Sequence, residues 1–320
     1  MNVGPPFIMQ THDFDSLPRG FLAGSAVTIG NFDGVHLGHR RIIGRTLERG
    51  RLLDLPVGVL TFDPHPREVV LRGQVVPAIM SFTERARLIE KLGVDYLFKI
   101  HFTPEFAAQR AETFVEALTA RLNPRVVVIG HDFRFGQGRE GSGELLAGLG
   151  VRLGFAAETV PVVEVGGKPV SSTRIRGLIQ AGEMGRARRL LGAPFSLTGE
   201  IVPGHGRGRG LGFATANLKV ESRLMPPDGV YVARARFEGQ DRPAVVNIGF
   251  NPTFGDSTRS IEAHVLDFDG DLYTHTLTLD LYERLRGEIK FNNPEELKAQ
   301  IGRDIAAARR ILAEANVEAE

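Results

Sequence analysis

The stretch SAVTIGNFDGVHLGH, residues 25–39, decides the first half of the fold. Residues 25–29 are small or apolar and predict a buried strand, and residues 41–51 predict a helix. The turn between them carries His36 and His39, whose spacing lets two side chains share one face of a helix. A helix N-terminus offers unpaired N–H groups and the positive end of the helix dipole. The stretch therefore predicts a site for nucleotide phosphates at the end of a strand.

The turn has no large aliphatic residue except Val35 and Leu37, so we expect it to contribute little to a hydrophobic core. A single histidine near the start of a helix usually has a structural role, and that alternative applies to each histidine taken alone. Here, however, glycines and short polar residues surround both histidines within ten residues. The cluster favours function, with His36 and His39 as catalytic groups and Asn31, Asp33 and Gly34 as phosphate-binding residues.

Length and composition bound the class of protein. The chain has 320 residues, which suits one large or two ordinary domains, and its 42% hydrophobic content is typical of soluble globular proteins. A net charge of +1 gives no sign of a polyanion-binding surface, so we expect no nucleic-acid partner. The absence of cysteine excludes disulfides, thiolate nucleophiles and cysteine-ligated metals. With no signal-peptide pattern at the start and no apolar run of ~18 residues, we expect a cytoplasmic protein without a membrane partner.

In the first half of the chain, short apolar runs typical of strands alternate with segments whose apolar residues have helical spacing. Further strands are predicted at 56–62, 95–100, 125–130 and within 151–165, and further helices at 83–92, 104–122 and 142–149. This alternation predicts a doubly wound α/β sheet, in which ligands bind beyond the carboxyl ends of the strands. The turn at 30–39, FDPHP at 62–66 and GHDF at 130–133 all lie at such ends. We expect these three motifs, including Asp132, to converge on one crevice.

The second half has a different rhythm. Two short helices are predicted within 175–191, and after Pro194 six strands follow without helices between them, at 195–202, 213–220, 230–237, 244–248, 259–266 and 275–285. They predict a small antiparallel β-barrel, followed by an amphipathic helix that begins near Pro294. We therefore predict two domains, residues 1–193 and residues 194–320.

A second phosphate-binding candidate is SSTRIR, residues 171–176. Ser172 and Thr173 are residues that start helices, and Arg176 follows in the next turn. Hydroxyl groups, helix-end N–H groups and a guanidinium together can bind a leaving pyrophosphate. The alternative is an ordinary capped basic helix. The chain has no Walker A sequence and no GxGxxG after a strand, so its ATP site is of another type.

The second half contains a glycine-rich basic segment, GHGRGRGLGFATANL at 204–218. Glycine lets backbone N–H groups approach phosphates, which makes phosphate-binding candidates of Gly206, Arg207, Gly208 and Gly210. Thr215 and Asn217 supply neutral oxygens on one side of a strand, a set that suits Mg²⁺ together with phosphates. The alternative is a basic loop that binds RNA, against which the barrel has few aromatic residues for stacking.

The segment IEAHVLDFDGDLY, residues 261–273, predicts a strand and a turn. Glu262 and His264 point to the same face of that strand. Glu262 is a candidate general base for a hydroxyl nucleophile, and a solvated barrel face is the alternative interpretation.

Taken together, these motifs resemble those of the bacterial bifunctional riboflavin kinase/FAD synthetase family. The resemblance covers nearly the whole chain in the expected order, through GNFDGVHLGH, TFDPHP, GHDFRFG, SSTRIR, GRGLGFATANL, GVY, NIGFNPTFG and IEAHVLDFDGDLY. It implies an α/β sheet of the nucleotidyltransferase type, which transfers AMP from ATP to FMN with release of pyrophosphate. It also implies a barrel that phosphorylates riboflavin to FMN with ATP.

The resemblance also implies roles for individual residues. Thr215 and Asn217 hold Mg²⁺–ATP, and Glu262 is the base for the ribityl hydroxyl. His36, His39, Ser172, Thr173 and Arg176 handle the phosphates of adenylyl transfer, and Asp132 lines the same site. The cofactor is Mg²⁺, ATP is a co-substrate, and the flavins are substrates and products. The chain departs from the family pattern at Ala214, where proline is usual, and at Thr274, where glycine is expected.

Two other functions are compatible with parts of the sequence. One is a cytidylyl- or adenylyltransferase for another phosphate ester with the barrel as a regulatory module, which the TAN and IEAH segments disfavour. The other is an RNA-binding barrel fused to a nucleotide sensor, which the near-neutral charge disfavours. The oligomeric state is left open.

Overall fold

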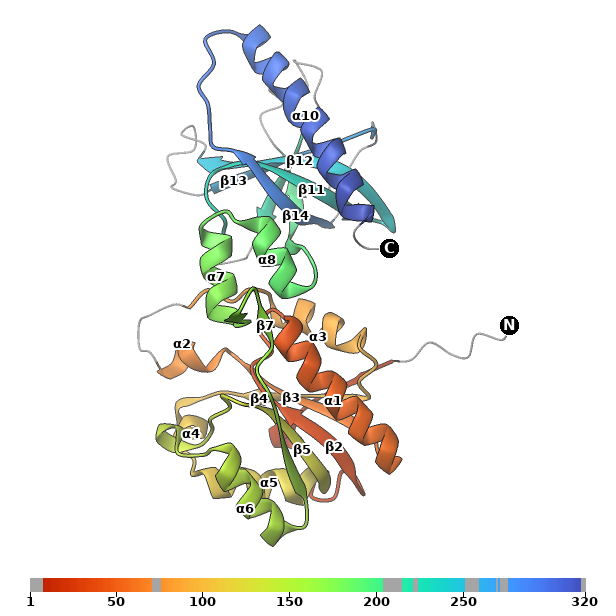
Figure 1. The fold of residues 1–320 in the computed structure, drawn as a ribbon, viewed down its shortest axis with the longest axis vertical. Helices are drawn as coiled ribbons and strands as arrows, with labels where there is room; N and C mark the ends of the chain where they lie inside the picture. Colours follow the sequence, from red (N-terminus) through yellow and green to blue (C-terminus); the bar gives the residue numbers. More distant parts are fainter. Residues whose placement is uncertain are drawn as a thin grey trace, which may run out of the picture. The chain divides into compact units, whose positions relative to one another are not determined.

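The apolar run at 25–29 forms β2 (Ser25–Ile29), one of six strands in a parallel sheet (Figure 1). The strand order is β1-β4-β3-β2-β5-β6, and every pairing is parallel. The other strands are β1 (Gln10–Asp13), β3 (Val57–Asp63), β4 (Tyr96–His101), β5 (Pro124–Gly130) and β6 (Ala156–Val160). This computed structural model describes residues 8–70, 76–203, 215–220, 224–250, 259–268, 270 and 276–317.

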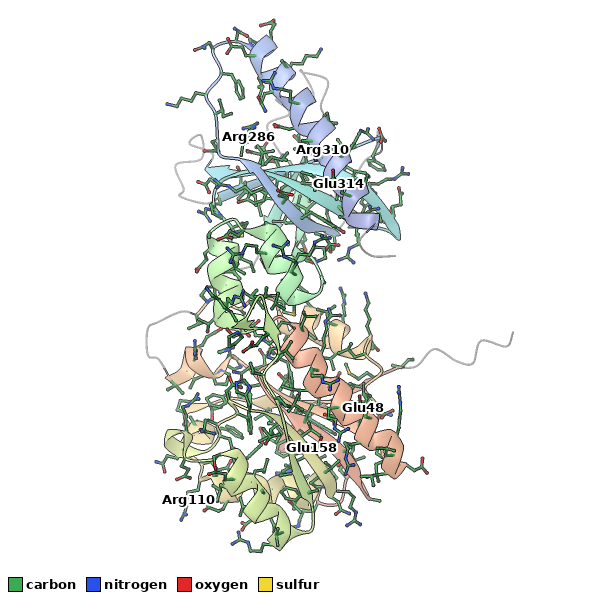
Figure 2. All side chains as sticks on the ribbon, in the orientation of Figure 1. Glu48, Arg110, Glu158, Arg286, Arg310 and Glu314 are labelled. Carbon is green, nitrogen blue, oxygen red and sulfur yellow. The ribbon has the colours of Figure 1, made fainter. Side chains whose placement is uncertain are left out.

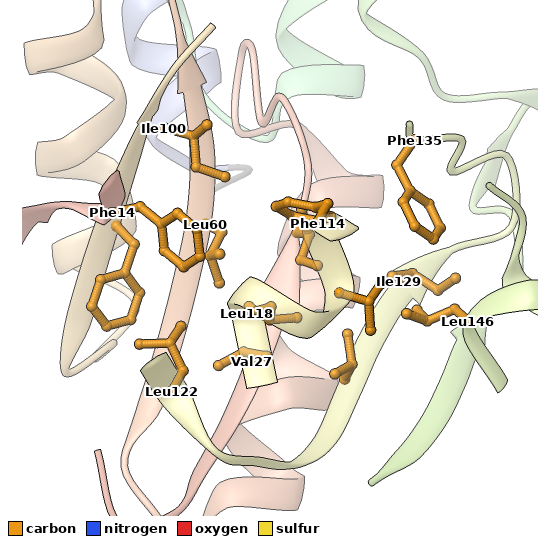
Figure 3. Packing of buried hydrophobic residues seen from close by; sticks show 14 of the residues in the cluster. Phe14, Val27, Leu60, Ile100, Phe114, Leu118, Leu122, Ile129, Phe135 and Leu146 are labelled. Atoms are coloured by element: carbon orange, nitrogen blue, oxygen red, sulfur yellow. The ribbon is translucent and has the colours of Figure 1, made fainter. Parts of the chain in front are cut away.

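Helices cover both faces of the sheet, which is why the central strands β2, β3 and β5 are buried along nearly their whole length. On one face, Ile43 of α1 (Leu37–Leu53) and Ile89 of α3 (Phe82–Glu90) pack with Val126 and Val128 of β5. On the other face, helices α5 (Ala111–Leu122) and α6 (Gly143–Leu153) contribute Leu118 and Leu146, which pack with the intervening β5 residues Val127 and Ile129 (Figure 3). Alternate side chains of β5 therefore lie in two hydrophobic cores, one on each face of the sheet.

The predicted helix at 104–122 is wrong in one respect, because it is two helices. Helix α4 (Pro104–Ala107) ends before Arg110, and α5 starts anew at Ala111. The Glu140 carboxylate accepts a hydrogen bond from the backbone N–H of Ala111 (2.9 Å), and the Gln109 carbonyl accepts one from Gln137 N–H (2.8 Å). A loop distant in sequence therefore satisfies groups that a continuous helix would have used.

Other boundaries also differ modestly from those predicted. Helix α1 begins at Leu37 rather than residue 41, and α6 continues through Val151 to Leu153, so strand structure begins only at β6. Strand β1 was not predicted. The remaining short elements of this half are η1 (Phe14–Ser16), α2 (Pro66–Val70), η2 (Gln137–Arg139), β7 (Glu164–Val165) and β8 (Lys168–Pro169).

Ion pairs on the outer surface of α1 add little to this packing. Arg45 contacts Glu48 one turn further along the helix (3.0 Å) and also pairs with Glu158 of β6; both acidic residues are labelled in Figure 2. About a third of the Arg45 side chain is exposed, and ion pairs at such positions contribute about 0–1 kcal/mol. The buried apolar stripe of α1, rather than its charges, therefore holds it to the sheet.

The second half forms a closed barrel of six antiparallel strands, as predicted. Their order is β10-β13-β12-β11-β14-β9, and β9 closes the barrel against β10. The strands are β9 (Phe195–Val202), β10 (Ala216–Val220), β11 (Gly229–Phe237), β12 (Gln240–Phe250), β13 (Arg259–Val265) and β14 (Thr276–Arg286). Many of the fully buried side chains are small, among them Ala233, Ala235, Ala244 and Ala263, as expected for the narrow interior of a small barrel.

The C-terminal helix α10 (Pro294–Val317) covers part of the outer face of the barrel. Its Ala308 and Leu312 pack against Val230, Val232 and Val245. Next to this contact, Arg286 at the end of β14 (labelled in Figure 2) donates hydrogen bonds from Nε and Nη2 to the buried Asp304 carboxylate of α10, the shortest at 2.7 Å. This pair attaches α10 to the end of β14 through a buried carboxylate.

Backbone contacts divide the chain into two units, Met1–Ser172 and Thr173–Glu320. This division groups α7 (Ser172–Gln180) and α8 (Met184–Leu191) with the barrel, and both helices were predicted. The sequence places the boundary at 193/194 instead, and that boundary stays a prediction. Among the described residues, no helix has both the length and the apolar character that a membrane span requires.

Candidate active sites

Three of the predicted motifs follow neighbouring strands. In the sheet order, β3, β2 and β5 are adjacent and parallel, so the segments after residues 63, 29 and 130 leave the same edge. The order also reverses between β2 and β5, because the chain proceeds from β2 to β3 on one side and reaches β5 on the other. Such a switch point is where open α/β sheets bind ligands. The predicted crevice therefore has the topology that a ligand site needs.

The two histidines meet in a way that the sequence only partly predicted. His36 is the N-cap of α1 rather than a residue on its face, and its Nδ1 accepts a hydrogen bond from the backbone N–H of His39 (3.3 Å). The two rings still stack, with centroids 3.5 Å apart and planes 17° apart. An accepting Nδ1 places the ring proton of His36 on Nε2. His36 thus caps the helix and keeps a hydrogen-bond donor on its other nitrogen.

The backbone of this turn is held in an uncommon conformation. Phe32 and Val35 have φ angles of 48° and 37°, in the left-handed region that β-branched residues avoid. A hydrogen bond from Val35 N–H to the Phe32 carbonyl (3.0 Å) closes the turn. Gly38 leaves room for the His36 ring, because a Cβ there would stand 3.1 Å from His36 Cε1. Such strain persists only where surrounding contacts hold it, and it is common at functional sites.

The electrostatic surroundings keep His39 uncharged. Burial of the ring lowers the pKa of His39 well below its ordinary value, and the neighbouring His36 and the Arg85 cation lower it further. Its Nδ1 is buried and has no hydrogen-bond partner among the described residues. At neutral pH, His39 is therefore a neutral imidazole whose ring lies against that of His36.

Asp33 and Ser172 connect the histidine turn to two other segments of the first unit. The buried Asp33 carboxylate accepts hydrogen bonds from the backbone N–H groups of Ile79 (2.9 Å) and Met80 (3.4 Å), just before α3. The hydroxyl of Ser172 donates to the Asp33 carbonyl (2.9 Å). The structure thus brings Ser172 to the turn, and it gives the Asp33 side chain backbone partners that hold the turn in place.

The remaining predicted residues of this site are placed as follows. Asn31 is half-buried and its carbonyl accepts a hydrogen bond from the Thr61 hydroxyl (3.1 Å), while Gly34 has a φ of 90°. Asp132 is exposed just after β5. On α7, Thr173 is exposed and Arg176 is buried, and both belong to the second unit.

In the barrel, a row of polar residues crosses three adjacent strands. Glu262 of β13 lies directly opposite Asn217 of β10 on one side and opposite Asn247 of β12 on the other. Its sequence neighbours Ile261 and Ala263 are buried, so the alternation of the strand puts Glu262 on the outer face. Side chains directly opposite each other on a sheet have Cβ atoms about 5 Å apart. The two predicted residues Asn217 and Glu262 are thus brought together, with an asparagine on the far side of Glu262.

Other predicted residues of the barrel site are only partly described. Thr215 directly precedes β10 and is half-buried, and His264 lies opposite Val245, two residues further along the same face as Glu262. The glycine-rich candidates Gly206, Arg207, Gly208 and Gly210 lie outside the described residues, as do Ala214 and Thr274. Within the described ranges, no group of three His, Asp or Glu side chains could hold a metal ion.

Two family models match the chain. The FAD synthetase model matches residues 20–174, which contain the histidine turn and strands β2 to β6 of the parallel sheet. The riboflavin kinase model matches residues 191–312, which contain the barrel. The chain belongs to the bifunctional riboflavin kinase/FMN adenylyltransferase family. It is a flavin-cofactor enzyme with both activities, and the predictions of family, fold and function are confirmed.

Curated relatives match over most of their length. The bifunctional riboflavin kinase/FMN adenylyltransferase of Pseudomonas fluorescens is 39% identical over 91% of this chain and 94% of that protein. The Escherichia coli K12 protein of the same description is 37% identical over 94% of this chain and 96% of its own. A solved structure described as a macrolide-efflux protein from Streptococcus pneumoniae has a TM-score of 0.86 at 30% identity, covering 94% of this chain and 99% of that one. The fold of both halves is therefore shared with that protein.

Two residues that sequence patterns did not single out lie beside the predicted groups. Asn247 stands next to Glu262, and the strand register could have found it, because the NIG and IEAH segments were both predicted to be strands or their ends. Arg85 lies on α3, outside every motif, and its charge acts on His39. A basic residue in an amphipathic helix gives no signal in the sequence that it is buried.

Proposed function

We propose that the FMN adenylyltransferase reaction takes place at the edge of the sheet where β3, β2 and β5 end, with His36 and His39 as its catalytic residues. The observation that supports this most is the stacked pair of imidazoles at the N-terminus of α1. That helix end offers backbone N–H groups and the positive end of its dipole to a phosphate. No other arrangement in the described part of the first unit combines two ring donors with a helix N-terminus.

In this reaction a phosphate oxygen of FMN attacks the α-phosphorus of ATP. The bond from that phosphorus to the α,β-bridging oxygen breaks, and pyrophosphate leaves with the electron pair. Extra negative charge develops on the α-phosphate oxygens, where the Nε2–H of His36 and the ring of His39 act as fixed donors. Ser172, Thr173 and Arg176 bind the pyrophosphate, and Asn31, Gly34 and Asp132 line the nucleotide. Asp33 contributes by holding the turn.

We further propose that riboflavin phosphorylation takes place on the outer face of the barrel with Glu262 as general base. Its carboxylate takes the proton of the ribityl hydroxyl while that oxygen attacks the γ-phosphorus of ATP, and ADP leaves. The support is the row Asn217–Glu262–Asn247, which puts a carboxylate between two carboxamides. Asn247 then orients Glu262 or the flavin from the side opposite Asn217.

The residues present fit Mg²⁺ at this second site. Thr215 and Asn217 supply hard, neutral oxygen ligands at the start of β10, and a site with few protein ligands completed by phosphates is the usual form for this ion. When bound, Mg²⁺ neutralises negative charge on the ATP phosphates. The glycine-rich residues Gly206, Arg207, Gly208 and Gly210 are proposed to bind those phosphates.

The two assignments are tested together, because one chain carries both reactions. The purified protein is incubated with ATP, Mg²⁺ and either riboflavin or FMN, and flavin products are separated by chromatography. We expect His36→Ala to slow FAD formation from FMN by about 10²–10³-fold while FMN still forms from riboflavin. We expect Glu262→Gln to slow FMN formation by about 10²–10⁴-fold while FMN is still converted to FAD.

Two outcomes would contradict the assignments. Parallel loss of both reactions in either folded variant would show that the division of labour is wrong. For the metal, Asn217→Ala should raise the Mg²⁺ concentration needed for half-maximal kinase rate, and an unchanged Mg²⁺ dependence would remove Asn217 from the metal site. Lys219→Ala, on the same strand, is the matched control.

We also propose that the ligands are limited to ATP, the flavins and pyrophosphate, without nucleic acid. The net charge of +1 supports this, since nucleic-acid binding rests mainly on positive charge. The domain boundary at 193/194 and the cytoplasmic location stay predictions from the sequence.

A further inference from the structure

Arg85 is a buried arginine that belongs to no predicted motif. It lies in the middle of α3, whose N-terminus is capped by a reciprocal pair of hydrogen bonds between Ser81 and Glu84. Only 5% of Arg85 is exposed, and burial lowers its pKa although Asp33 and Asp63 oppose that effect. A buried guanidinium is costly unless its donors are satisfied, so its partners indicate what it does.

Those partners are two backbone carbonyls at the ends of adjacent strands. Nη1 of Arg85 donates to the Asn31 carbonyl (2.7 Å), and Nη2 donates to the Phe62 carbonyl (2.9 Å). Asn31 follows β2 and begins the histidine turn, while Phe62 lies near the end of β3, in TFDPHP. The planar fork of one side chain thus joins the two loops that leave the proposed adenylyl-transfer edge.

This junction is reinforced from both sides. The Thr61 hydroxyl of β3 donates to the same Asn31 carbonyl (3.1 Å). The Phe82 ring lies 5.4 Å from the guanidinium carbon of Arg85, within the range of a cation–π contact. The turn that begins at Asn31 contains the left-handed residues Phe32 and Val35, whose conformations need outside contacts to persist.

We propose that Arg85 is a positioning residue for adenylyl transfer, whose forked hydrogen bonds to Asn31 and Phe62 hold the histidine turn in its productive geometry. The inference rests on the proposed function of His36 and His39. A displacement of reacting groups by about 1 Å can cost about 10²-fold in rate, so a contact that fixes the turn affects catalysis without touching substrate.

Arg85 also acts on the site through its charge. Besides burial, the groups that lower the pKa of His39 are His36 and Arg85. Removing the guanidinium charge therefore raises the pKa of His39. If the adenylylation rate falls in acid because His39 becomes protonated, that fall then occurs at a higher pH. A purely structural arginine elsewhere in the core would not move that fall, and this difference separates the two roles.

The experiment compares Arg85→Met and Arg85→Lys with the unaltered enzyme and with the control Arg87→Met, an exposed arginine on the same helix. FMN adenylylation is measured over a range of ATP concentration and pH, and thermal unfolding of the same preparation reports on the folding of the parallel-sheet unit. We expect Arg85→Met to lower kcat for adenylylation by about 10–10²-fold, with a smaller change in KM and with the His39-dependent fall in rate at a higher pH. Arg85→Lys keeps the positive charge, so the pH dependence should stay that of the unaltered enzyme. Its kcat should still fall, because an ammonium group cannot make the two hydrogen bonds of the guanidinium fork.

The proposal is overturned if Arg85→Met leaves kcat unchanged or if Arg85→Lys restores it fully. Should Arg85→Met fail to fold, Thr61→Val removes the second donor to Asn31 and is expected to lower kcat in the same direction by a smaller factor; an unchanged kcat there also overturns the proposal. Failure of the proposed function is recognised separately, since it would leave His36→Ala active in adenylylation. A fully active His36→Ala together with impaired Arg85 variants would point to a different catalytic centre at this edge.

Discussion

In the parallel-sheet unit the candidate catalytic groups lie beyond the ends of strands, whereas in the barrel they lie within strands. His36 caps a helix after a strained turn. The turn is held by hydrogen bonds from Ile79 to Asp33 and from Arg85 to Asn31, and Gly38 leaves space for the His36 ring. Glu262 has no such dependence, because the register of β13 with β10 and β12 puts it between Asn217 and Asn247.

The difference teaches what each site is sensitive to. A site built on a turn is only as accurate as the hydrogen bonds that hold the turn, so remote changes in those contacts should impair adenylyl transfer alone. A site built on a sheet face is fixed by ladder hydrogen bonds and by the alternation of side chains. Such a site is sensitive instead to changes in the outer face of the barrel, which α10 covers in part.

The largest expected effect tests that covering helix. Asp304→Leu removes the buried carboxylate that pairs with the partly exposed Arg286 guanidinium, which should lower the free energy of unfolding of the barrel by about 3 kcal/mol. The measurement is the denaturant concentration at which kinase activity is lost. The double variant Arg286→Met/Asp304→Leu should recover most of the loss. Asp267→Asn, which breaks the exposed pair with Arg309 on the same helix, should change nothing measurable.

The comparison also predicts that Asp33 holds the turn. Asp33→Ala leaves the backbone N–H groups of Ile79 and Met80 without their acceptor, which should cost about 1–3 kcal/mol of stability. Adenylyl transfer should fall, and riboflavin phosphorylation should not. Thermal unfolding with both assays checks this. A raised KM for ATP at unchanged stability would instead make Asp33 a ligand of the nucleotide.

A smaller effect concerns the pH dependence of stability. In the unfolded chain His39 binds a proton near pH 6.5, whereas in the folded protein its pKa is lowered by burial, His36 and Arg85. Acid therefore favours the unfolded state, and stability is lost as pH falls below 6.5 toward the folded pKa. Denaturant titrations at several pH values should show this loss to be weaker in His39→Gln, by at most about 1.4 kcal/mol per pH unit. Equal slopes for the two proteins would contradict it.

The smallest expected effect compares two glycines of α1. A Cβ at Gly38 would stand 3.1 Å from the His36 ring, whereas one at Gly44 would meet nothing within 4 Å. Gly38→Ala should force His36 off its rotamer at a cost of about 1 kcal/mol, or about fivefold in the adenylylation rate. Gly44→Ala should leave that rate unchanged and stabilise the helix by up to about 1 kcal/mol. Equal rates in the two variants would show that the His36 ring has room to move.

Much of both folds could be predicted from local pattern. The strands at β2 and β9 match their predicted bounds, because apolar runs between turn residues leave few alternatives. The break between α4 and α5 could not be predicted, since its cause is a carboxylate, Glu140, that arrives from a later loop. The capping role of His36 was missed for a related reason, because helix patterns locate the start of a helix only to within a few residues.

The sequence by itself determined the family, the two activities and the residue types at each site, because those motifs are local and each stands next to its own strand. Only the tertiary structure decided which residues meet. It put Asn247 beside Glu262 through strand register. It made the Asp33 carboxylate a hydrogen-bond acceptor for the backbone of Ile79 and Met80. It also buried Arg85, which bonds to carbonyls at the ends of two strands. Such contacts join residues far apart in the chain, and their geometry depends on how the whole sheet packs, which no single stretch of sequence contains.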